Sequence, residues 1–285
     1  MQYGQGPTDL ASRTPEHSQT RSLAEPPSPT VDWDYTALAD SYVSRPGYAE
    51  AAIDALLAIT GPAAKRLAID LGAGTGHLTA PLAERGSSVV ALEPNDMMRR
   101  HGIARTACFA KVRWMVGRME RTGLPPGQFS LATCGSSFGV ADRGATLREV
   151  GRILEPEGWF ACMWNYRDLR DPLQQDIEAH IKACIPDYQY GTRRDDQEAV
   201  ITASGLFRRV RVVESGIVHR PTKSSWIEAW HSHATLQRQA GHRFANIVAG
   251  IAAIVEQASG DHVDVPYTTR VWIAQSRNDI ARPPA

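Results

Sequence analysis

The sequence predicts an α/β fold, in which helices cover both faces of a mostly parallel sheet. Short apolar runs alternate with segments of helical apolar spacing through the middle of the chain. The connections between successive runs are long enough to hold a helix, as parallel neighbouring strands require. With 285 residues, of which 42% are hydrophobic, the chain can bury one sizeable core.

The N-terminal segment, residues 1–30, differs in composition from the rest of the chain. It is rich in Pro, Ser, Thr, Gln and Gly and has hardly an apolar residue. Such a segment cannot offset the entropy cost of ordering, so we expect it to be disordered. We expect one ordered domain over residues 31–285, with a first helix over residues 49–59 that Gly61-Pro62 ends.

Strands and helices alternate from residue 67 onward. Asn95 is a typical N-cap residue and predicts a helix after it, and "EPEG" at 155–158 predicts a turn. The other expected helices cover 77–86 and 143–154, and the expected strands cover 67–71, 88–92, 112–116, 129–134 and 159–164.

The C-terminal part has another pattern. Residues 206–214 and 267–275 alternate in character, which predicts a closing antiparallel hairpin. Two insertions, at 166–204 and 222–257, leave the sheet near the edge where ligands bind in such folds. We therefore expect both insertions to be lid elements.

Charge and cysteine usage limit the classes of partner. Lys plus Arg equals Asp plus Glu at 31 each, so nothing suggests nucleic acid. No apolar run approaches the roughly 20 residues that span a bilayer, and no signal-peptide pattern stands at the N-terminus. We expect a cytoplasmic protein without a membrane partner or metal site, and with reduced thiols at Cys108, Cys134, Cys162 and Cys184.

A glycine-rich turn follows the first expected strand in "AIDLGAGTGHLTAPLAERGSSVVALEPND". Gly72 and Gly74 fit a dinucleotide fingerprint, but Gly76 adds a different spacing and His77 stands where the third glycine is wanted. The turn by itself fits a tight strand–helix connection, a nicotinamide cofactor or another nucleoside.

Two carboxylates decide between these cofactors. Asp70, at the end of the first strand, suits an ammonium group and would oppose a pyrophosphate. Glu93 ends the second strand without a basic neighbour, as expected for a residue that binds a ribose diol. S-adenosylmethionine offers an ammonium and a ribose without a phosphate, so we expect it as the cofactor.

These residues also carry a family resemblance. "AIDLGAGTGHLT" and "VALEPNDMM" resemble motifs one and two of class I S-adenosylmethionine-dependent methyltransferases. "YTALADSYVSRPGY", "REVGRILEPEGWFACMWNYRD" and "VPYTTRVWIAQSR" resemble the branch with trans-aconitate methyltransferase and related small-molecule enzymes. The resemblance implies a Rossmann-like seven-stranded sheet with one antiparallel strand, the cofactor across the C-terminal strand ends, and residues 31–60 as a further lid element.

The resemblance also implies roles for single residues. Asp70 and the turn should hold the methionine end, and Glu93 the ribose. Met119 stands where an alanine is usual. The full set of expected cofactor-binding residues is Asp70, Gly72, Ala73, Gly74, Gly76, Glu93, Pro94, Met98, Met119, Glu120, Ser136, Tyr35, Tyr42 and Arg45.

The N-terminal segment with Trp33, Tyr35, Tyr42 and Arg45 covers the cofactor in such relatives. Tyr35 or Tyr42 can close over the methionine portion, or these aromatic rings simply pack the lid. Arg45 can meet a carboxylate of the cofactor or of the substrate.

After the fourth strand, "CGSSFGVAD" departs from the branch pattern. Gly139-Val140 stands where His-Trp is usual, so a histidine that can act as base or ligand is missing. Ser136 and Ser137 remain as polar groups near the reacting centre, or they satisfy the loop backbone.

The remaining candidates for the reaction lie in "WNYRD" and "WHSHATL". Asn165 and Tyr166 can donate or accept hydrogen bonds, while Trp164 is expected to pack under the lid. His231 and His233 lie two residues apart, so on a helix at most one points inward. That histidine is our candidate general base.

We therefore expect a small-molecule methyltransferase of secondary metabolism that acts on a carboxylate or another oxygen or nitrogen nucleophile. Four arginines can receive an acidic substrate: Arg45, Arg167, Arg193 and Arg194. The first alternative is intramolecular displacement within S-adenosylmethionine, with release of methylthioadenosine. A nicotinamide oxidoreductase and a binding protein without catalysis are further alternatives.

Overall fold

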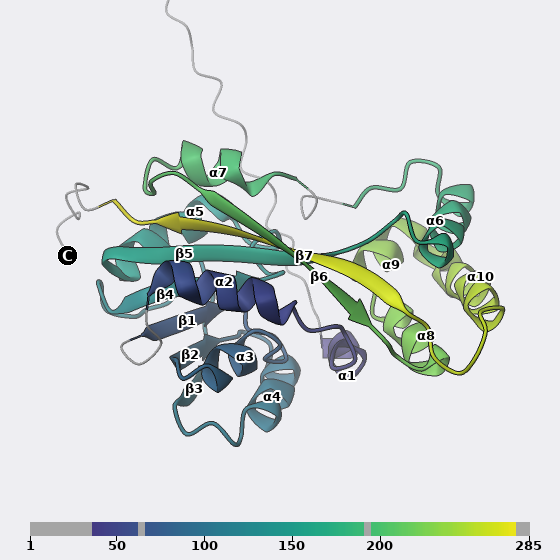
Figure 1. Cartoon of the computed structure of the whole chain (residues 1–285), viewed down its shortest axis with the longest axis horizontal. Coiled ribbons are helices and arrows are strands. Elements are labelled where there is room, and N and C mark those ends of the chain that lie inside the picture. Colours follow the sequence, from purple (N-terminus) through teal and green to yellow (C-terminus); the bar gives the residue numbers. More distant parts are fainter. Residues whose placement is uncertain (1–35, 62–65, 191–194, 278–285) are drawn as a thin grey trace, which may run out of the picture.

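The computed structural model describes residues 36–61, 66–190 and 195–277. The expected disorder of residues 1–30 and the candidates Trp33, Tyr35, Arg193 and Arg194 lie outside these ranges. The described chain folds around one seven-stranded sheet with the strand order β3-β2-β1-β4-β5-β7-β6 (Figure 1).

Parallel pairing joins the first five strands of the sheet, and β7 lies antiparallel between β5 and β6. This arrangement confirms the mostly parallel sheet with one antiparallel strand. The strands are β1 (Leu67–Leu71), β2 (Ser88–Leu92), β3 (Val112–Met115), β4 (Phe129–Gly135), β5 (Leu154–Arg167), β6 (Arg211–His219) and β7 (Val265–Gln275).

Helices cover both faces of this sheet, as the sequence predicts. They are α1 (Ala39–Tyr42), α2 (Glu50–Thr60), α3 (Thr79–Glu84), α4 (Asp96–Arg105), α5 (Arg143–Ile153), α6 (Pro172–Cys184), α7 (Gln197–Ala203), α8 (Lys223–His231), α9 (Ala234–Ala240) and α10 (Phe244–Glu256). Asn95 caps α4 as expected, because its side chain accepts a hydrogen bond from the Met98 N–H at 3.0 Å.

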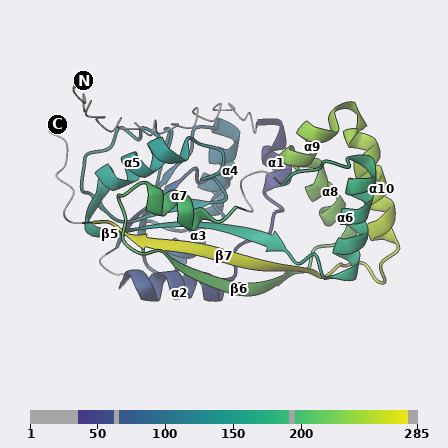
Figure 2. The ribbon, with the colours of Figure 1, turned by 90° about the horizontal axis from the view of Figure 1, so that it is seen from above.

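Two apolar cores lie on the two faces of the sheet. One packs α2 and α3 through Ile53, Leu56 and Leu82 against side chains of the central strands. The other packs α5 and α7 through Val150 and Ile201 against the opposite face. Figure 2 shows α2 on one side of the sheet and α5 and α7 on the other.

A third core belongs to a cap made of α6, α8, α9 and α10, which stands beyond the C-terminal ends of the parallel strands (Figures 1 and 2). Trp226, Trp230 and Ile251 are buried in it. The cap is built from the two expected insertions, because α6 comes from the first and α8 to α10 from the second. It encloses the space above the strand ends, where a ligand is expected.

Three details differ from the sequence-based expectations. The expected turn at 155–158 is part of β5, which begins at Leu154 and contains a register irregularity opposite Phe129. β6 begins at Arg211 rather than residue 206 and reaches His219. In the expected lid 31–60, α2 packs into a sheet core, so only the residues before it border the site.

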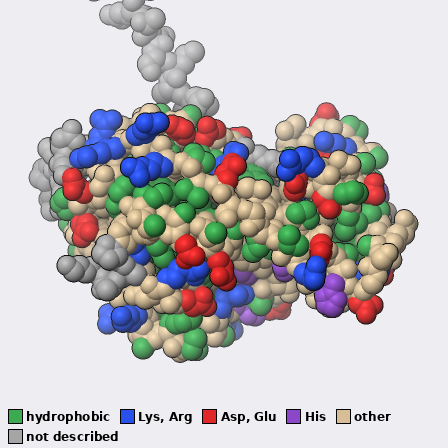
Figure 3. Space-filling view, in the orientation of Figure 1, with side chains coloured by type: hydrophobic (Ala, Val, Ile, Leu, Met, Phe, Trp, Pro, Cys, Tyr) green, Lys and Arg blue, Asp and Glu red, His purple; other side chains and the backbone are tan. Residues whose placement is uncertain are grey.

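The outer face seen in Figure 3 mixes basic and acidic side chains, in line with the balanced composition. Across the described part of the chain, no helix has both the length and the apolar character that crossing a membrane demands.

Candidate functional site

A cavity of about 980 Å³ lies where the C-terminal ends of β1, β4 and β5 meet the cap. Its size is at the upper end of the range for small-molecule sites. The lining has two sides. The turn after β1 and the ends of β2 and β4 form the first, which we call the cofactor side. Residues 164–167 of β5, together with α8, α9 and β7, form the second. We call this second side the acceptor chamber; its lining residues are Trp164, Asn165, Tyr166, Arg167, Trp226, Ala229, Trp230, His233, Ala234, Thr235, Arg238 and Tyr267.

The glycine turn after β1 keeps the backbone open toward the cavity. Gly72, Gly74 and Gly76 have φ values of 65°, 55° and 81°, which favour glycine. A Cβ on Gly72 would lie 2.7 Å from the Cβ of Ser137 and 2.8 Å from the Cε of Met119. Residues 72 and 74 therefore cannot carry side chains without strain or displacement of the site.

Asp70 is a buried carboxylate at the cavity wall, with only 1% of its surface exposed. It accepts hydrogen bonds from the hydroxyls of Thr79 at 2.7 Å and Thr133 at 3.2 Å. Burial raises its pKa to about 6, against the lowering effect of these hydroxyls. Among the described residues it has no ion-pair partner, so a cationic group in the cavity would complement it.

Glu93 holds the turn and the next helix together. Its carboxylate accepts from the Gly74 N–H and from the Asn95 N–H, both at 2.9 Å. Burial also raises its pKa, while the two backbone donors lower it. Both oxygens are thereby fixed at the cavity wall, and each keeps lone-pair capacity for a hydroxyl of a ribose.

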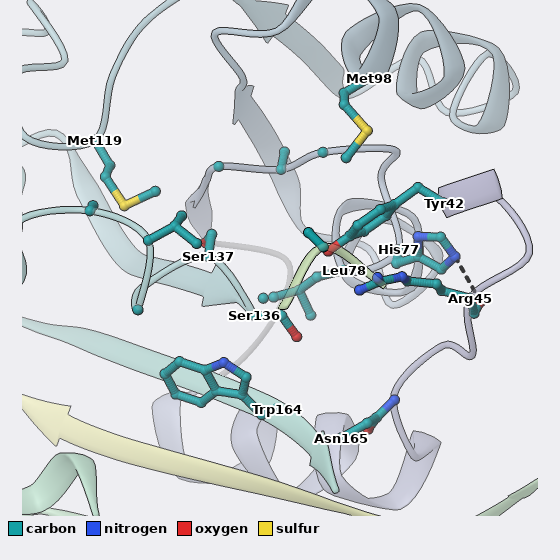
Figure 4. Close-up of a pocket in the computed structure, with 18 of the residues that line it drawn as sticks. Tyr42, Arg45, His77, Leu78, Met98, Met119, Ser136, Ser137, Trp164 and Asn165 are labelled. Carbon is teal, nitrogen blue, oxygen red and sulfur yellow. Dashed lines mark hydrogen bonds between the residues drawn. The ribbon is translucent and has the colours of Figure 1, made fainter. Parts of the chain in front are cut away.

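The expected adenine side is formed by Pro94, Met98, Met119 and Glu120, all of which line the cavity. Figure 4 shows the thioethers of Met98 and Met119 on different sides of the glycine turn. Such flexible apolar side chains suit a flat ring. Glu120 lies 3.8 Å from the Arg118 guanidinium.

The two serines after β4 have different roles. Ser136 has a φ of 62°, a strained value for a residue other than glycine. Its Oγ lies 3.0 Å from the hydroxyl of Tyr48, which the sequence did not single out. Ser137 donates to the Leu71 carbonyl at 2.6 Å and so satisfies the loop backbone, one of the two roles expected for it. Both line the cavity.

His77, the residue in place of a third glycine, joins the turn to the N-terminal segment. Its Nδ1 lies 2.8 Å from the Thr75 hydroxyl and its Nε2 lies 3.0 Å from the Arg45 carbonyl (Figure 4). Burial lowers its pKa to about 4, so the ring is neutral at physiological pH. Its role in the structure is to hold a segment that covers the cavity.

Arg45 continues this connection into the cap. Its guanidinium stacks on the Tyr42 ring at 3.9 Å and donates to the Ser232 carbonyl at 2.8 Å. Tyr42 and Arg45 both line the cavity, as expected. Part of the arginine's hydrogen-bonding capacity is therefore used within the protein, although a carboxylate was the expected partner.

The end of β5 brings the residues of "WNYRD" to the cavity. Trp164 is buried and packs edge-on against Trp272, as expected for a packing residue. Asn165 donates to the Gly47 carbonyl at 2.8 Å and accepts from the Thr269 hydroxyl at 2.5 Å. Its amide thus anchors the segment before α2. Tyr166 also lines the cavity.

Arg167 is one of the residues that line the acceptor chamber. It donates to the Gln174 side-chain oxygen at 2.9 Å, and its guanidinium lies 4.5 Å from the centre of the Trp230 ring. This contact places a cation beside the aromatic wall of the chamber.

Only one of the two candidate histidines lines the cavity, as the spacing in the sequence predicts. His233 lines the cavity and stacks on Trp230, with ring centres 5.1 Å apart. His231 is exposed at the end of α8 and is not among the residues that line the cavity. The structure therefore brings only His233 to the site.

S-adenosylmethionine fits the residues on the cofactor side. Asp70 and Glu93 are two buried carboxylates at one wall, and burial disfavours the charge of both. A ligand with an ammonium, a sulfonium and a ribose diol supplies the missing positive charge and two hydroxyl donors. A pyrophosphate would instead place negative charge against Asp70.

The chain matches known methyltransferases over the part that builds this side. Residues 69–162 match the family described as a methyltransferase domain. An uncharacterised methyltransferase of Mycobacterium tuberculosis strain H37Rv is 38% identical over 126 residues, which are 44% of this chain and 49% of that protein. The ubiquinone/menaquinone biosynthesis C-methyltransferase UbiE of Rubrivivax gelatinosus is 37% identical over 107 residues, 36% and 40% of the two chains. The chain thus spans about half the length, or less, of these curated relatives.

Two solved structures share the fold. The YcgJ protein of Bacillus subtilis superposes with a TM-score of 0.53 at 16% identity, over 80% of this chain and 99% of that chain. A candidate type II methyltransferase from Anaeromyxobacter dehalogenans superposes with a TM-score of 0.55 at 21% identity, over 82% and 98%. The sheet thus shares the fold of these structures, residues 69–162 match a methyltransferase domain, and S-adenosylmethionine is the cofactor that the two buried carboxylates fit.

Proposed function

We propose that the chain transfers a methyl group from S-adenosylmethionine to an oxygen of a small acidic molecule held in the acceptor chamber. The observation that carries this proposal is the charge of the chamber. Its lining contains Arg167, Arg238 and His233 but no Asp or Glu among the described residues. The acidic residues that line the cavity have lower numbers: Asp70, Glu93, Glu120 and Asp142.

The charges of the lining residues therefore differ between the part of the cavity expected to hold the cofactor and the part expected to hold the acceptor. The rest of the lining holds four carboxylates together with three arginines, Arg45, Arg118 and Arg143, whereas the acceptor chamber holds arginine without a carboxylate among the described residues and so suits an anionic acceptor. An amine acceptor would bring a second positive charge toward Arg167, whose guanidinium contacts the uncharged Gln174 side chain and the Trp230 ring. The aromatic lining from Trp164, Trp226, Trp230 and Tyr267 supports an acceptor with an apolar body.

When bound, S-adenosylmethionine supplies a methyl group on a positively charged sulfur, which leaves as the thioether of S-adenosylhomocysteine. A carboxylate oxygen that forms the new C–O bond has no proton to lose, and its charge cancels that of the sulfonium. The residues of this chain then need only bind, align and exclude water. This fits a site in which "GV" replaces the usual His-Trp pair.

The resemblance of several segments to the trans-aconitate methyltransferase branch also supports a carboxylate acceptor and a small-molecule substrate. Ser136, held by Tyr48 at the end of β4, and Tyr166 at the end of β5 are our candidates for contact with the reacting groups. We propose that Asn165 contributes by anchoring the segment that covers the cavity.

The proposal is tested with S-adenosylmethionine that carries a deuterated methyl group, incubated with the protein and a pool of organic acids. We expect mass spectrometry to find a deuterium-labelled methyl ester together with S-adenosylhomocysteine. A label found on carbon or nitrogen would contradict the carboxylate acceptor while keeping methyl transfer. Gly72→Ala is the inactive control, since its Cβ would collide with Ser137.

A further inference from the structure

The strand β6 is the last strand on one side of the sheet and has a neighbour, β7, along one edge only. Within the described part of the chain, the backbone of β6 bonds to no segment other than β7. Its side chains are also open to solvent, because Arg211, Val212, Glu214, Gly216 and Val218 are all exposed. A free edge of this kind can pair with a strand of another chain.

The two edges of the sheet differ in their protection against such pairing. Proteins commonly protect an exposed edge with a short strand, a charged side chain, a proline or a bulge. The opposite edge follows this rule, because β3 has four residues and carries the exposed Arg113. In contrast, β6 has nine residues without a lysine or proline, and it pairs with β7 in unbroken register. Its exposed valines, Val212 and Val218, show 45% and 59% of their surface. These features are typical of an interface strand.

The sequence of β6, "RVVESGIVH", has the same apolar pattern when it is read in either direction from Ser215. Two copies of one strand that pair antiparallel are related by a twofold axis. Residues directly opposite each other share a face of the sheet, so the axis must pass through a residue. With the axis at Ser215 all nine residues find a partner. Val212 then lies opposite Val218 of the second copy, and Val213 lies opposite Ile217.

The charged residues of β6 agree with this register. Glu214 lies opposite Gly216, and its carboxylate is already paired with Arg270 of β7. Arg211 lies opposite His219, and burial lowers the pKa of that histidine, so its ring is neutral at pH 7.5.

The neighbouring registers match less well. An axis at residue 214 places Val212 opposite Gly216, and an axis at residue 216 places Val218 opposite Glu214. Only the axis at Ser215 sets each apolar side chain of the strand against another apolar one.

We propose that the edge of β6 binds a second copy of this chain, with the two β6 strands antiparallel about a twofold axis at Ser215. The two sheets then form one continuous sheet, and the exposed valines are covered in two Val212–Val218 pairs. This interface does not depend on the reaction that the chain catalyses. Because one strand per copy is a small contact, the dimer forms reversibly, with a Kd on the order of 10 μM.

Sedimentation of the full chain at increasing concentration tests the dimer. We expect a monomer–dimer equilibrium over about 1–300 μM. Val218→Lys places an ammonium opposite Val212 and should weaken dimerisation by about tenfold or more. Val116→Lys is the matched control, because Val116 is a 65% exposed valine beside β3 at the other edge. A monomer at every concentration, or a dimer that Val218→Lys leaves intact, would overturn the proposal.

Cysteine cross-linking tests the register, in protein whose exposed Cys108 and half-buried Cys184 are replaced by serine. Ser215→Cys places a thiol opposite its own copy, with Cβ atoms about 4.5–5.5 Å apart, so mild oxidation should yield a covalent dimer. Val212→Cys and Val218→Cys should each stay monomeric alone, because identical thiols lie about 20 Å apart along the strand. An equal mixture of these two variants should cross-link.

The remaining outcomes also decide the question. If Val212→Cys cross-links alone as efficiently as the mixture, the register is wrong and the proposal fails. A monomer whose β6 amides are nevertheless protected from hydrogen exchange would show that another segment of the same chain covers the edge, which also overturns it. Binding of S-adenosylhomocysteine shows that each variant is folded, and the labelled-methyl assay reports on the proposed function separately.

Discussion

At the scale of single residues, the site contains buried charged groups that lower the stability of the ligand-free protein. Asp70 is buried without an ion-pair partner among the described residues, and burial raises its pKa from 3.8 to about 6. A buried carboxylate of this kind lowers stability, and we propose that a cationic ligand in the cavity accounts for its presence. The sequence singled out Asp70 and Glu93 because each lies at the end of a strand next to the turn, and the structure places both at the cavity wall.

Replacement of Asp70 by Asn should reveal this cost. With a raised pKa, the folded state holds a proton that the unfolded state loses, so stability falls as pH rises from about 4 to about 6. Above pH 6 the cost is fully present. We expect Asp70→Asn to raise the unfolding free energy of the ligand-free protein at pH 7.5 by on the order of 2–3 kcal/mol.

Calorimetric melting curves at two pH values measure this effect. At pH 4 the gain should vanish, because the wild-type carboxyl is then protonated in the folded state. The same variant should bind S-adenosylmethionine at least about tenfold more weakly. A variant that is less stable than wild type at pH 7.5 and binds the cofactor normally would refute the role of Asp70.

The pH dependence of cofactor binding is a second consequence. An ammonium beside Asp70 favours its ionised form, so binding lowers a pKa that starts at about 6. Below pH 6 binding should therefore release protons and weaken. Titrations at pH 5.5 in two buffers of different ionisation enthalpy measure the released protons. Equal apparent enthalpies in the two buffers would contradict the coupling, and the same titrations of Asp70→Asn are the control.

At the scale of elements, the N-terminal segment connects the cofactor side to the cap. His77 binds the Arg45 carbonyl, and the Arg45 guanidinium binds the Ser232 carbonyl between α8 and α9. Arg105 of α4 adds a bond of 3.2 Å to the Val43 carbonyl. The sequence singled out His77 only because it stands where a third glycine is expected. Its hydrogen-bond partner Arg45 lies 32 residues away, and a local pattern does not reveal such a contact.

We expect His77→Ala to loosen this segment and to weaken S-adenosylmethionine binding by about 5- to 20-fold, because two partly buried hydrogen bonds are lost. His101→Ala is the matched control. His101 also ties the segment down, through Asp40 at 2.8 Å, but the aspartate is exposed and such pairs contribute little. Limited proteolysis and calorimetry measure both variants, and an equal effect of the two would contradict this role of His77.

At the scale of the whole molecule, the cavity lies between a sheet that the sequence predicted well and a cap that it predicted only as helical. β1 and β2 coincide with the expected strands because their apolar runs are short and contiguous. The acceptor chamber combines β5, α8, α9 and β7, and its geometry depends on packing between distant segments. Periodicity carries no information on such contacts, so the pairing of Tyr48 with Ser136 was missed.

The measurement that tests the central claim most directly identifies the nucleoside formed when the protein consumes S-adenosylmethionine in the presence of an acidic acceptor. Methyl transfer predicts S-adenosylhomocysteine in the same molar amount as methylated acceptor, and neither product from Gly72→Ala. Methylthioadenosine as the main product, formed equally without any acceptor, would contradict methyl transfer and show intramolecular displacement instead.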